Sequence, residues 1–481
     1  MIRKALLAIA AIVLVLSGVL VFNAFRFESK QESIEPVALD SLRKKSLERF
    51  QKAIQYQTIS YGDSTRFDST AFVGFRNFLS SAYPLVHAAM SREVVGKYSL
   101  LYHWEGVHPE LRPVILMAHQ DVVPIEEATR SRWTNNPFGG IIRDNAIWGR
   151  GTADDKINLI AILEAIEKLL AQKFSPDRTL YLAFGHDEEL GGKGAVALAE
   201  LLKSRGVKAD MVLDEGGIIT TDKIPQFEQP VALLGTSEKG YMSLELTVEK
   251  TGGHSSQPDA ETAIDILLRA VERIRENPFD SDLSESTKGF LEYLGPEMPF
   301  SRKVVFANPW LFSGVIKKIY ESTPSGNAII RTTAVTTIIS AGVKDNVIPA
   351  VANATVNFRL LPGDKGSDII ERVKRLIADD RVKVSIHNGF LAEASKVSPV
   401  DGYGFKHVSR AVRESIPQAI VAPFLMIGGT DSRHFGEISD NIIKFSPMVD
   451  PEGYRGIDEH VSLESYRLAI GFYERLIRNL N

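Results

Sequence analysis

The stretch that decides the fold is Trp148–Lys156, with the sequence W-G-R-G-T-A-D-D-K. Its two glycines allow a tight turn and a close approach to another segment of backbone. Asp154 and Asp155 come directly before a strongly helical run that begins at Ile157, and negative charge is favoured at a helix N-terminus. Acidic residues in such a place are often simple helix caps. Four other clusters of acids and histidines in the chain favour a functional site instead.

Length and composition restrict the class of protein. The chain has 481 residues, which is long for one ordinary core and predicts two domains. The net charge is -4, so the basic surface typical of nucleic-acid binding is not indicated and no nucleic-acid partner is expected. Cysteine is absent from the sequence, which excludes disulfides and thiolate ligands. Any metal must therefore be bound by histidines and carboxylates.

Residues 1–27 are predicted to be a membrane anchor or a signal. Arg3 and Lys4 precede the apolar run Ala5–Phe22, which is just long enough to span a bilayer. A good small-x-small cleavage site is not found, which favours an uncleaved anchor over a cleaved signal or a buried core helix. The basic residues predict that the rest of the chain is extracytoplasmic, which means periplasmic in a Gram-negative bacterium. Cleavage would instead give a secreted protein. Residues 28–40 are polar and are interpreted as a linker.

Apolar, strand-like runs precede each group of acids and histidines. Val114–Ala118, for example, is typical of a buried parallel strand and leads directly into His119. Open α/β sheets place their sites at the carboxyl ends of such strands. The segments that follow the four runs are His119–Asp121, Asp154–Asp155, His186–Glu189 and Asp214–Glu215. Because acids or histidines follow all four runs, we predict one site at a common edge of the sheet.

A second domain begins near residue 237. From there the runs follow the order strand–helix–strand–strand–helix–strand, which is the ferredoxin-like split motif. We therefore predict an α/β catalytic domain formed by residues 41–236 and 391–481, with a mixed sheet and flanking helices. An α+β domain at 237–390 is inserted into it. Within that domain, segment 277–327 is rich in aromatic residues and is interpreted as a local mini-core, with a lid for an apolar substrate as the alternative.

Five side chains from these clusters and from the Gly428–Phe435 motif are candidate metal ligands. Zinc accepts nitrogen and oxygen ligands, and five are more than one tetrahedral ion uses. Two Zn²⁺ ions that share Asp154 as a bridge fit better, and paired ions activate water and polarise a carbonyl. Asp121 is then the partner that orients His119, and Glu188 is the general base. The five candidates are His119, Asp154, Glu189, Asp214 and His434.

The motifs together resemble the co-catalytic zinc peptidases, a family that includes carboxypeptidase S, glutamate carboxypeptidase, aminoacylase and succinyl-diaminopimelate desuccinylase. The resemblance runs from about residue 45 to the end, and the branch of carboxypeptidase S and the enzymes that cleave or form N-fatty-acyl amino acids is the most similar. The motifs that carry it are H-Q-D (119–121), G-R-G-T-A-D-D-K (149–156), D-E-E-L-G-G (187–192), D-E-G-G (214–217), G-G-H-S-S-Q-P (252–258) and G-G-T-D-S-R-H-F (428–435).

The resemblance implies roles for the individual residues. One zinc is bound by His119, Asp154 and Asp214, and the other by Asp154, Glu189 and His434. The peptide bond between Asp154 and Asp155 is expected to be cis. A departure from the family is Lys156-Ile157, where many members have Lys-Gly, and it is interpreted as a feature of the subfamily.

The inserted domain mediates dimerisation in many members, so a homodimer is expected. His254 resembles the histidine that stabilises the tetrahedral oxyanion, often across the dimer interface, and a turn cap is the alternative. Arg359 and Asn346 resemble residues that bind the substrate carboxylate, a task that suits the bidentate guanidinium. A surface salt bridge is the alternative for both.

The predicted function is a zinc-dependent metallohydrolase that cuts the amide bond next to a C-terminal free amino acid. The substrate is either a short peptide, which makes the protein a carboxypeptidase, or an N-acyl amino acid. The aromatic insert and the anchor lean slightly toward acyl substrates. A non-catalytic binding ectodomain on the same fold is a third possibility, and the presence of all five ligands and Glu188 argues against it.

Overall fold

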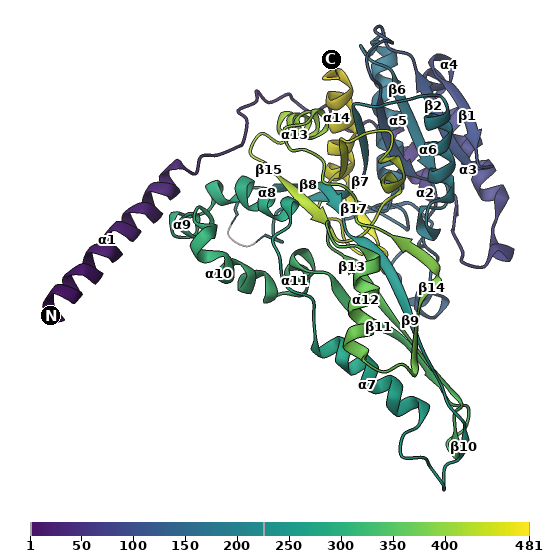
Figure 1. Cartoon of the computed structure of the whole chain (residues 1–481). Coiled ribbons are helices and arrows are strands. Elements are labelled where there is room, and N and C mark those ends of the chain that lie inside the picture. The colour runs from purple at the N-terminus through teal and green to yellow at the C-terminus, as the bar shows by residue number, and fades with distance from the viewer. Residues whose placement is uncertain (1, 225–226, 481) are drawn as a thin grey trace.

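The structure is a computed structural model that describes residues 2–224 and 227–480. Figure 1 shows a catalytic domain, an elongated small domain that ends in a hairpin, and a long N-terminal helix that projects from the body. This helix, α1 (Ile2–Arg26), is long and apolar enough to cross a membrane. The strands of the large sheet come from two pieces of the chain, before and after the small domain in the sequence.

The catalytic domain is built on one eight-stranded mixed sheet, which confirms the predicted α/β class. β3 pairs in parallel with β6 and β7, because apolar strands buried on both faces suit a parallel centre. At one edge of the sheet, β2 pairs antiparallel with both β1 and β6. In spatial order the strands are β1 (Ser91–Val95), β2 (Ser99–Trp104), β6 (Leu180–Gly185), β3 (Val114–His119), β7 (Met211–Thr220), β16 (Ile442–Val449), β8 (Val231–Glu238) and β15 (Ile420–Met426). A small sheet contains β17 (His460–Ser462), β5 (Ala146–Trp148) and β4 (Ile141–Arg143).

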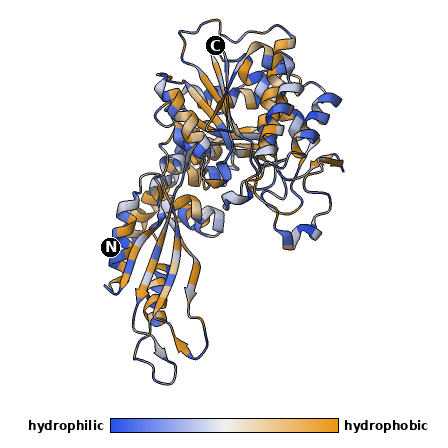
Figure 2. Cartoon of the chain, turned by 90° about the vertical axis from the view of Figure 1, so that its right-hand side faces the viewer, coloured by the Kyte–Doolittle hydropathy of each residue, from blue (hydrophilic) through white to orange (hydrophobic). Residues whose placement is uncertain are grey.

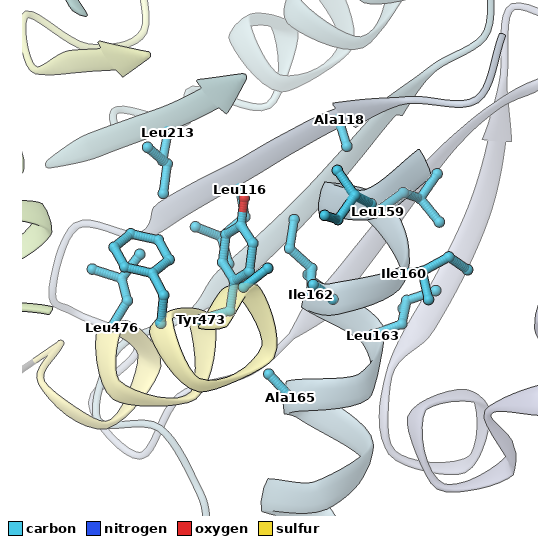
Figure 3. Packing of buried hydrophobic residues seen from close by; sticks show 14 of the residues in the cluster. Leu116, Ala118, Leu159, Ile160, Ile162, Leu163, Ala165, Leu213, Tyr473 and Leu476 are labelled. Atoms are coloured by element: carbon cyan, nitrogen blue, oxygen red, sulfur yellow. The ribbon is translucent and has the colours of Figure 1, made fainter. Parts of the chain in front are cut away.

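Helices cover both faces of this sheet. The helix α5 (Lys156–Ala171) is apolar around most of its circumference, so it lies buried between β3 and α14 (Leu463–Arg478). Figure 3 shows Leu159 of α5 beside Ala118 of β3, and Ile162 of α5 beside Leu116 of β3 and Tyr473 of α14. The other helices are α2 (Lys44–Ile54), α3 (Ser69–Ala82), α4 (Pro84–Ala89), α6 (Lys193–Ser204) and α13 (Tyr403–Ser415), and the short 3-10 turns are η1 (Ser64–Arg66), η2 (Glu127–Arg132), η3 (Glu188–Leu190) and η5 (Asp431–Phe435).

The small domain has the predicted ferredoxin-like arrangement. Its four antiparallel strands, in spatial order, are β11 (Thr333–Ala341), β13 (Val351–Leu360), β9 (Gly240–Glu249) and β14 (Val382–Ala392). The helices α7 (Ala263–Glu276) and α12 (Gly366–Ile377) cover one face, and Figure 2 shows hydrophobic and hydrophilic residues mixed along the strands, as a sheet covered on one side requires. A distal hairpin joins β10 (Gly253–His254) to β12 (Val347–Ile348). β11 begins at Thr333, shortly after Ile330 ends a helix.

The aromatic segment 277–327 is a helical layer with its own core. Its elements are α8 (Glu285–Leu294), η4 (Gly295–Glu297), α9 (Phe300–Phe306), α10 (Pro309–Glu321) and α11 (Pro324–Ile330). Buried Leu291 and Ile316 pack inside this layer, and α8 packs on β15. The layer also contacts the end of α1, where the Asn23 amide donates to Asn308 Oδ1 at 2.7 Å.

The segment after α1 is held against the catalytic domain. The side chain of Gln31 makes two hydrogen bonds with the backbone of Val421 on β15, each 2.9 Å long. Arg475 of α14 donates to the carbonyl oxygens of Val37 and Ala38 at 2.7 and 2.8 Å. The predicted linker is therefore a docked segment, and it fixes the place where α1 leaves the body.

Candidate metal centre

The opening stretch forms a tight turn that a distant carboxylate supports. Glu459 is fully buried, and its Oε1 accepts hydrogen bonds from the backbone N–H groups of Gly151 and Ala153, both at 2.9 Å. Arg150 donates to the other oxygen of Glu459. A side chain at Gly151 would strike Val122, since its Cβ would lie 2.9 Å from Cγ1, so glycine is required there. The peptide bond between Asp154 and Asp155 is cis, as expected.

This turn presents acidic side chains to a histidine at the end of β3. His119 Nε2 lies 3.0 Å from Asp154 Oδ1 and 3.3 Å from Glu215 Oε1. Two groups of side chains are compact enough to bind a metal ion, namely His119, Asp155 and Glu215, and His119, Asp154 and Glu189. His119, Asp154 and Glu189, three of the five predicted ligands, therefore lie together in the structure.

Two of the five predicted ligands lie outside these groups. β7 continues through Asp214 and Glu215, and neighbouring residues on a strand point to opposite faces. Glu215 therefore faces His119, whereas Asp214 accepts a hydrogen bond from the backbone of Ser432 at 2.8 Å. His434 contacts Arg433, whose Nε lies 3.3 Å from its ring, and burial and then Arg433 lower the pKa of His434 to about 4.

The donor set fits a divalent cation. Glu189 Oε1 and Glu215 Oε2 are buried without a hydrogen-bond partner among the described residues. Burial, together with the nearby charge of Asp154, raises the pKa of Glu188, Glu189 and Glu215 to about 8 each. So many carboxylates in a dry site need a positive charge to stay ionised. Imidazole and carboxylate donors are those that zinc accepts.

Asp121 connects the histidine to the acidic turn. Its Oδ1 lies 3.2 Å from His119 Nδ1, and Ser60 donates to its Oδ2 at 2.7 Å. The backbone N–H groups of Glu188 and Glu189 also donate to it, both at 3.2 Å. Asp121 is thus placed to orient the imidazole and the two glutamates together.

Arg455 is a member of the site that the sequence analysis did not identify. Its Nε donates to Asp154 Oδ2 at 2.7 Å, and its Nη2 lies 2.9 Å from Glu189 Oε2 and 3.5 Å from Glu188 Oε2. The residue lies in an irregular segment between β16 and β17, more than 260 residues after these glutamates. Glu459 comes from the same segment.

A cavity of about 830 Å³ opens beside the acidic cluster. Glu188, Glu189, Glu215 and Arg455 form part of its wall. Other parts of the wall are basic or apolar, and they include Lys239, Arg359, Arg433, Leu233, Phe424 and Met426. This combination suits a ligand with a negative end and an apolar body.

Comparison with known proteins identifies the family. Residues 115–479 match the sequence profile of peptidase family M20/M25/M40. The chain belongs to this family. It is 40% identical over 476 residues to "Probable carboxypeptidase S-like 2" of Dictyostelium discoideum, covering 96% of this chain and 91% of the relative. It is 41% identical over 442 residues to the human "N-fatty-acyl-amino acid synthase/hydrolase PM20D1", covering 90% of this chain and 87% of the relative.

Solved structures agree on the fold. The M20 family metallo-carboxypeptidase Sso-CP2 from Sulfolobus solfataricus superposes with a TM-score of 0.68 at 16% identity, covering 91% of this chain and 99% of that one. Human carnosine dipeptidase 1 gives a TM-score of 0.63 at 14% identity, covering 91% and 96%. At these identities the likeness shows the fold alone. Together with the family match, it makes the chain a member of a metallopeptidase family.

The remaining predicted residues of this M20 chain lie in two places. Arg359 lines the cavity and stacks over Tyr241, with its guanidinium 4.6 Å from the ring centre. His254 and Asn346 lie together on the distal hairpin, where the Ser255 N–H donates to the Asn346 carbonyl at 3.1 Å. Neither of them lines the cavity, and Figure 1 shows β10 at the end of the small domain farthest from the catalytic sheet.

Proposed function

We propose that the chain is a zinc-dependent amidohydrolase that releases a C-terminal free amino acid. The observation that carries the proposal is the juxtaposition of two compact donor sets around His119, one with Asp154 and Glu189 and one with Asp155 and Glu215. Buried Glu188 lies beside them, at the mouth of a cavity that also contains Arg359. The donors hold the metal, Glu188 accepts and returns a proton, and the guanidinium binds a carboxylate. A non-catalytic binding protein needs no such buried carboxylate beside the donors.

The residues of the chain divide the work as follows. The metal, when bound, polarises the amide carbonyl and lowers the pKa of water. Glu188 takes the proton from the attacking water and delivers it to the leaving amine, because it lies within the cluster yet is not needed as a donor. Asp121 contacts the His119 ring and accepts a hydrogen bond from the Glu188 backbone, so it fixes the positions of both residues. Burial and the neighbouring carboxylates keep the proton affinity of Glu188 high, as a base near neutral pH requires.

The basic part of the cavity suits the carboxylate of the released amino acid. Arg359 stacks over Tyr241, and its planar fork can hold a carboxylate bidentately. Arg433 adds positive charge to the same wall. This feature supports a carboxypeptidase acting on short peptides, and it serves an N-acyl amino acid equally well, because both substrates end in the same group.

One observation favours N-acyl amino acids as the second candidate substrate. Leu233, Phe424 and Met426 form an apolar wall of the cavity. The ring of Phe424 lies 6.0 Å from that of Phe290 on α8, so the wall continues into the aromatic insert. A long acyl chain could bury its methylene groups along this surface, each worth roughly 0.8 kcal/mol.

The test uses the zinc-loaded protein, a dipeptide and a long-chain N-acyl derivative of the same C-terminal residue. Release of the amino acid is measured with and without a chelator. Faster chelator-sensitive release from the dipeptide identifies a carboxypeptidase, whereas faster release from the acyl substrate assigns the apolar wall to the acyl chain. Absence of release from both in a metal-loaded protein would contradict the proposed class of reaction.

We infer that α1 is an uncleaved membrane anchor. Its last turns are part of the folded body, because Asn23 bonds Asn308, Ala24 is fully buried, and the ring of Phe25 lies 5.4 Å from that of Phe300. Cleavage after this helix would remove these contacts and expose the insert. The full chain is therefore expected to stay in the membrane fraction through an alkaline carbonate wash, and its N-terminal peptide is expected in the mass spectrum. Release of a shortened chain would support a cleaved signal.

We infer a homodimer in which the small domain of one copy completes the site of the other. His254 and Asn346 are exposed on the distal hairpin and cannot serve the cavity of their own chain from there. The edge strand β11 also exposes Val335, Ile338 and Ile339, each more than half accessible to solvent. An unpaired strand edge with apolar side chains is a surface suited to a second chain.

A further inference from the structure

The helix α10 of the aromatic segment is apolar on two opposite sides. Its inner side packs into the core of the helical layer, where Ile316 is fully buried. Its outer side carries an apolar residue at every fourth position, and each of these side chains is between 43% and 55% exposed. A helix that is apolar all round is typical of a protein core or of a membrane. The outer residues are Leu311, Val315 and Ile319.

Two aromatic residues extend this surface toward α1. Phe300 on α9 is half exposed, and its ring lies 5.4 Å from that of Phe25 at the end of α1. Trp310, at the start of α10, is 60% exposed and lines an apolar groove of about 440 Å³. Figure 1 shows α9 and α10 beside the half of α1 that is nearer to the body. We call Phe300, Trp310, Leu311, Val315 and Ile319 the outer face. The rest of the groove is formed by Ala11, Ile12, Val15, Leu16 and Val19.

Asn308 fixes this layer at a defined height along α1. It is buried, and its amide donates to the carbonyl oxygen of Leu20 at 3.1 Å. Its Oδ1 accepts from Asn23 at 2.7 Å and from Trp310 Nε1 at 3.2 Å. An α-helix rises 1.5 Å per residue, so the α1 residues of the groove lie roughly 6 to 18 Å beyond Asn23, away from the body. Trp310 therefore lies beside the part of α1 that would be in hydrocarbon.

The charge pattern of this region suits a lipid interface. Between Pro299 and Tyr320 there are four basic residues and no acidic residue, in a chain whose net charge is -4. Lysine and arginine can lay their methylene groups on hydrocarbon and keep their charge among the headgroups, and tryptophan is enriched at the same level. Lysine is depleted from protein–protein interfaces, which favours lipid over a second protein. The basic residues are Arg302, Lys303, Lys317 and Lys318.

We propose that the outer face is embedded in the leaflet of the bilayer nearest to the body, with lipid acyl chains in the groove beside Trp310. The inference rests on the proposed membrane anchor, because a spanning α1 is what brings this level of the molecule to the hydrocarbon. A single spanning helix leaves the body free to tilt. The contact of α9 and α10 with the same leaflet fixes one orientation of the body on the membrane surface.

Spin labelling tests where the outer face lies. The sequence contains no cysteine, so one introduced cysteine is the only labelling site. Val315→Cys is labelled in the full chain, which is reconstituted into nanodiscs of phosphatidylcholine and phosphatidylglycerol. Collisions of the label with oxygen, which concentrates in lipid, are expected to exceed collisions with a water-soluble nickel chelate. Val94→Cys changes a valine of similar exposure on β1, across the catalytic domain from α1, and should show the reverse.

The tryptophans allow a second measurement that needs no label. Lipids brominated on their acyl chains quench the fluorescence of a tryptophan that they contact. The wild type in nanodiscs of such lipids is expected to lose part of its fluorescence, and Trp310→Phe should abolish that loss. Trp133→Phe changes a partly exposed tryptophan of the catalytic domain and should keep it. Equal quenching in Trp310→Phe and the wild type would exclude contact between the outer face and the acyl chains.

The labelling experiment separates this inference from the proposed anchor. If the chain stays with the nanodisc but the label at residue 315 collides mainly with the nickel chelate, the outer face lies in water and only the anchor stands. A label protected from both reagents would mean that protein, such as a second copy of the chain, covers the outer face. A full chain that does not enter nanodiscs would overturn the anchor and this inference together.

Discussion

Glu188 is the side chain whose removal separates metal binding from chemistry. Glu188→Gln keeps the shape and the buried position but loses the proton acceptor. We expect the variant to bind zinc as the wild type does while turnover falls by about 100-fold or more, the usual contribution of a general base. Turnover and bound zinc are measured on the same preparation. The exposed Glu200→Gln on α6 is the matched control, and equal activity in both variants would contradict the assignment.

Glu459 is expected to act on the metal through the backbone. It is fully buried, and its Oε1 accepts from three backbone N–H groups of the turn, those of Gly151, Ala153 and Asp154. Glu459→Gln removes the negative charge and places amide hydrogens against N–H donors. Zinc affinity should fall by roughly 10- to 100-fold, as for other residues that support ligands.

Competition with a chelating dye measures the zinc affinity of Glu459→Gln. Glu464→Gln, which changes an exposed glutamate paired with Arg467, should leave zinc affinity unchanged. Equal affinities in the two variants would mean that the turn holds its shape without the buried carboxylate.

The same residues show where sequence reasoning stops. His119, Asp154 and Glu189 could be selected because each follows a recognisable apolar strand. Arg455 and Glu459 lie in an irregular segment near the C-terminus, and only tertiary structure reveals that they meet a turn some 300 positions earlier. No local pattern distinguishes such an arginine from a solvated one.

At the scale of elements, Lys239 is the junction between β8 of the catalytic domain and β9 of the small domain. Its ammonium group donates to the carbonyl oxygens of Ala328 and Arg331, both at 2.7 Å. Burial, and then the charge of Arg359, lower the pKa of Lys239 from 10.5 to about 7. The unfolded chain therefore binds more protons than the folded chain between these values, so this residue makes stability rise with pH in that window.

Lys239→Met removes this contribution. We expect the thermal unfolding midpoint of the wild type to gain more between pH 7 and pH 9 than that of the variant. Lys383→Met on β14 changes an exposed lysine and should keep the wild-type pH response. An identical response in Lys239→Met would show that the junction lysine keeps its ordinary proton affinity.

Element order was predictable because it depends on local periodicity. The ferredoxin-like order of the small domain and the buried helix α5 both follow from repeating apolar positions. β7 is different, because tertiary pairing with β16 and β8 continues the strand past the acidic pair to Thr220. That extension decides whether Asp214 or Glu215 faces the histidine.

At the scale of the whole molecule, the proposed dimer makes a prediction about mixtures. Glu188→Gln and His254→Ala should each be inactive as pure proteins. If His254 acts on the partner's site, a mixed dimer contains one site with both residues intact. Mixing the variants under conditions that allow exchange should therefore restore part of the activity. Inactivity of a mixed dimer whose formation is verified by mass would mean that His254 serves its own chain or none.

The two-piece construction of the catalytic domain has a consequence for biosynthesis. His119, Asp154 and Glu188 are made early, but Arg455 and Glu459, which neutralise and support them, are among the last residues to leave the ribosome. A nascent chain therefore holds its acidic residues without their counter-charge until synthesis is nearly complete. A premature stop before residue 455 would leave Asp154 and Glu189 without the guanidinium that pairs with them.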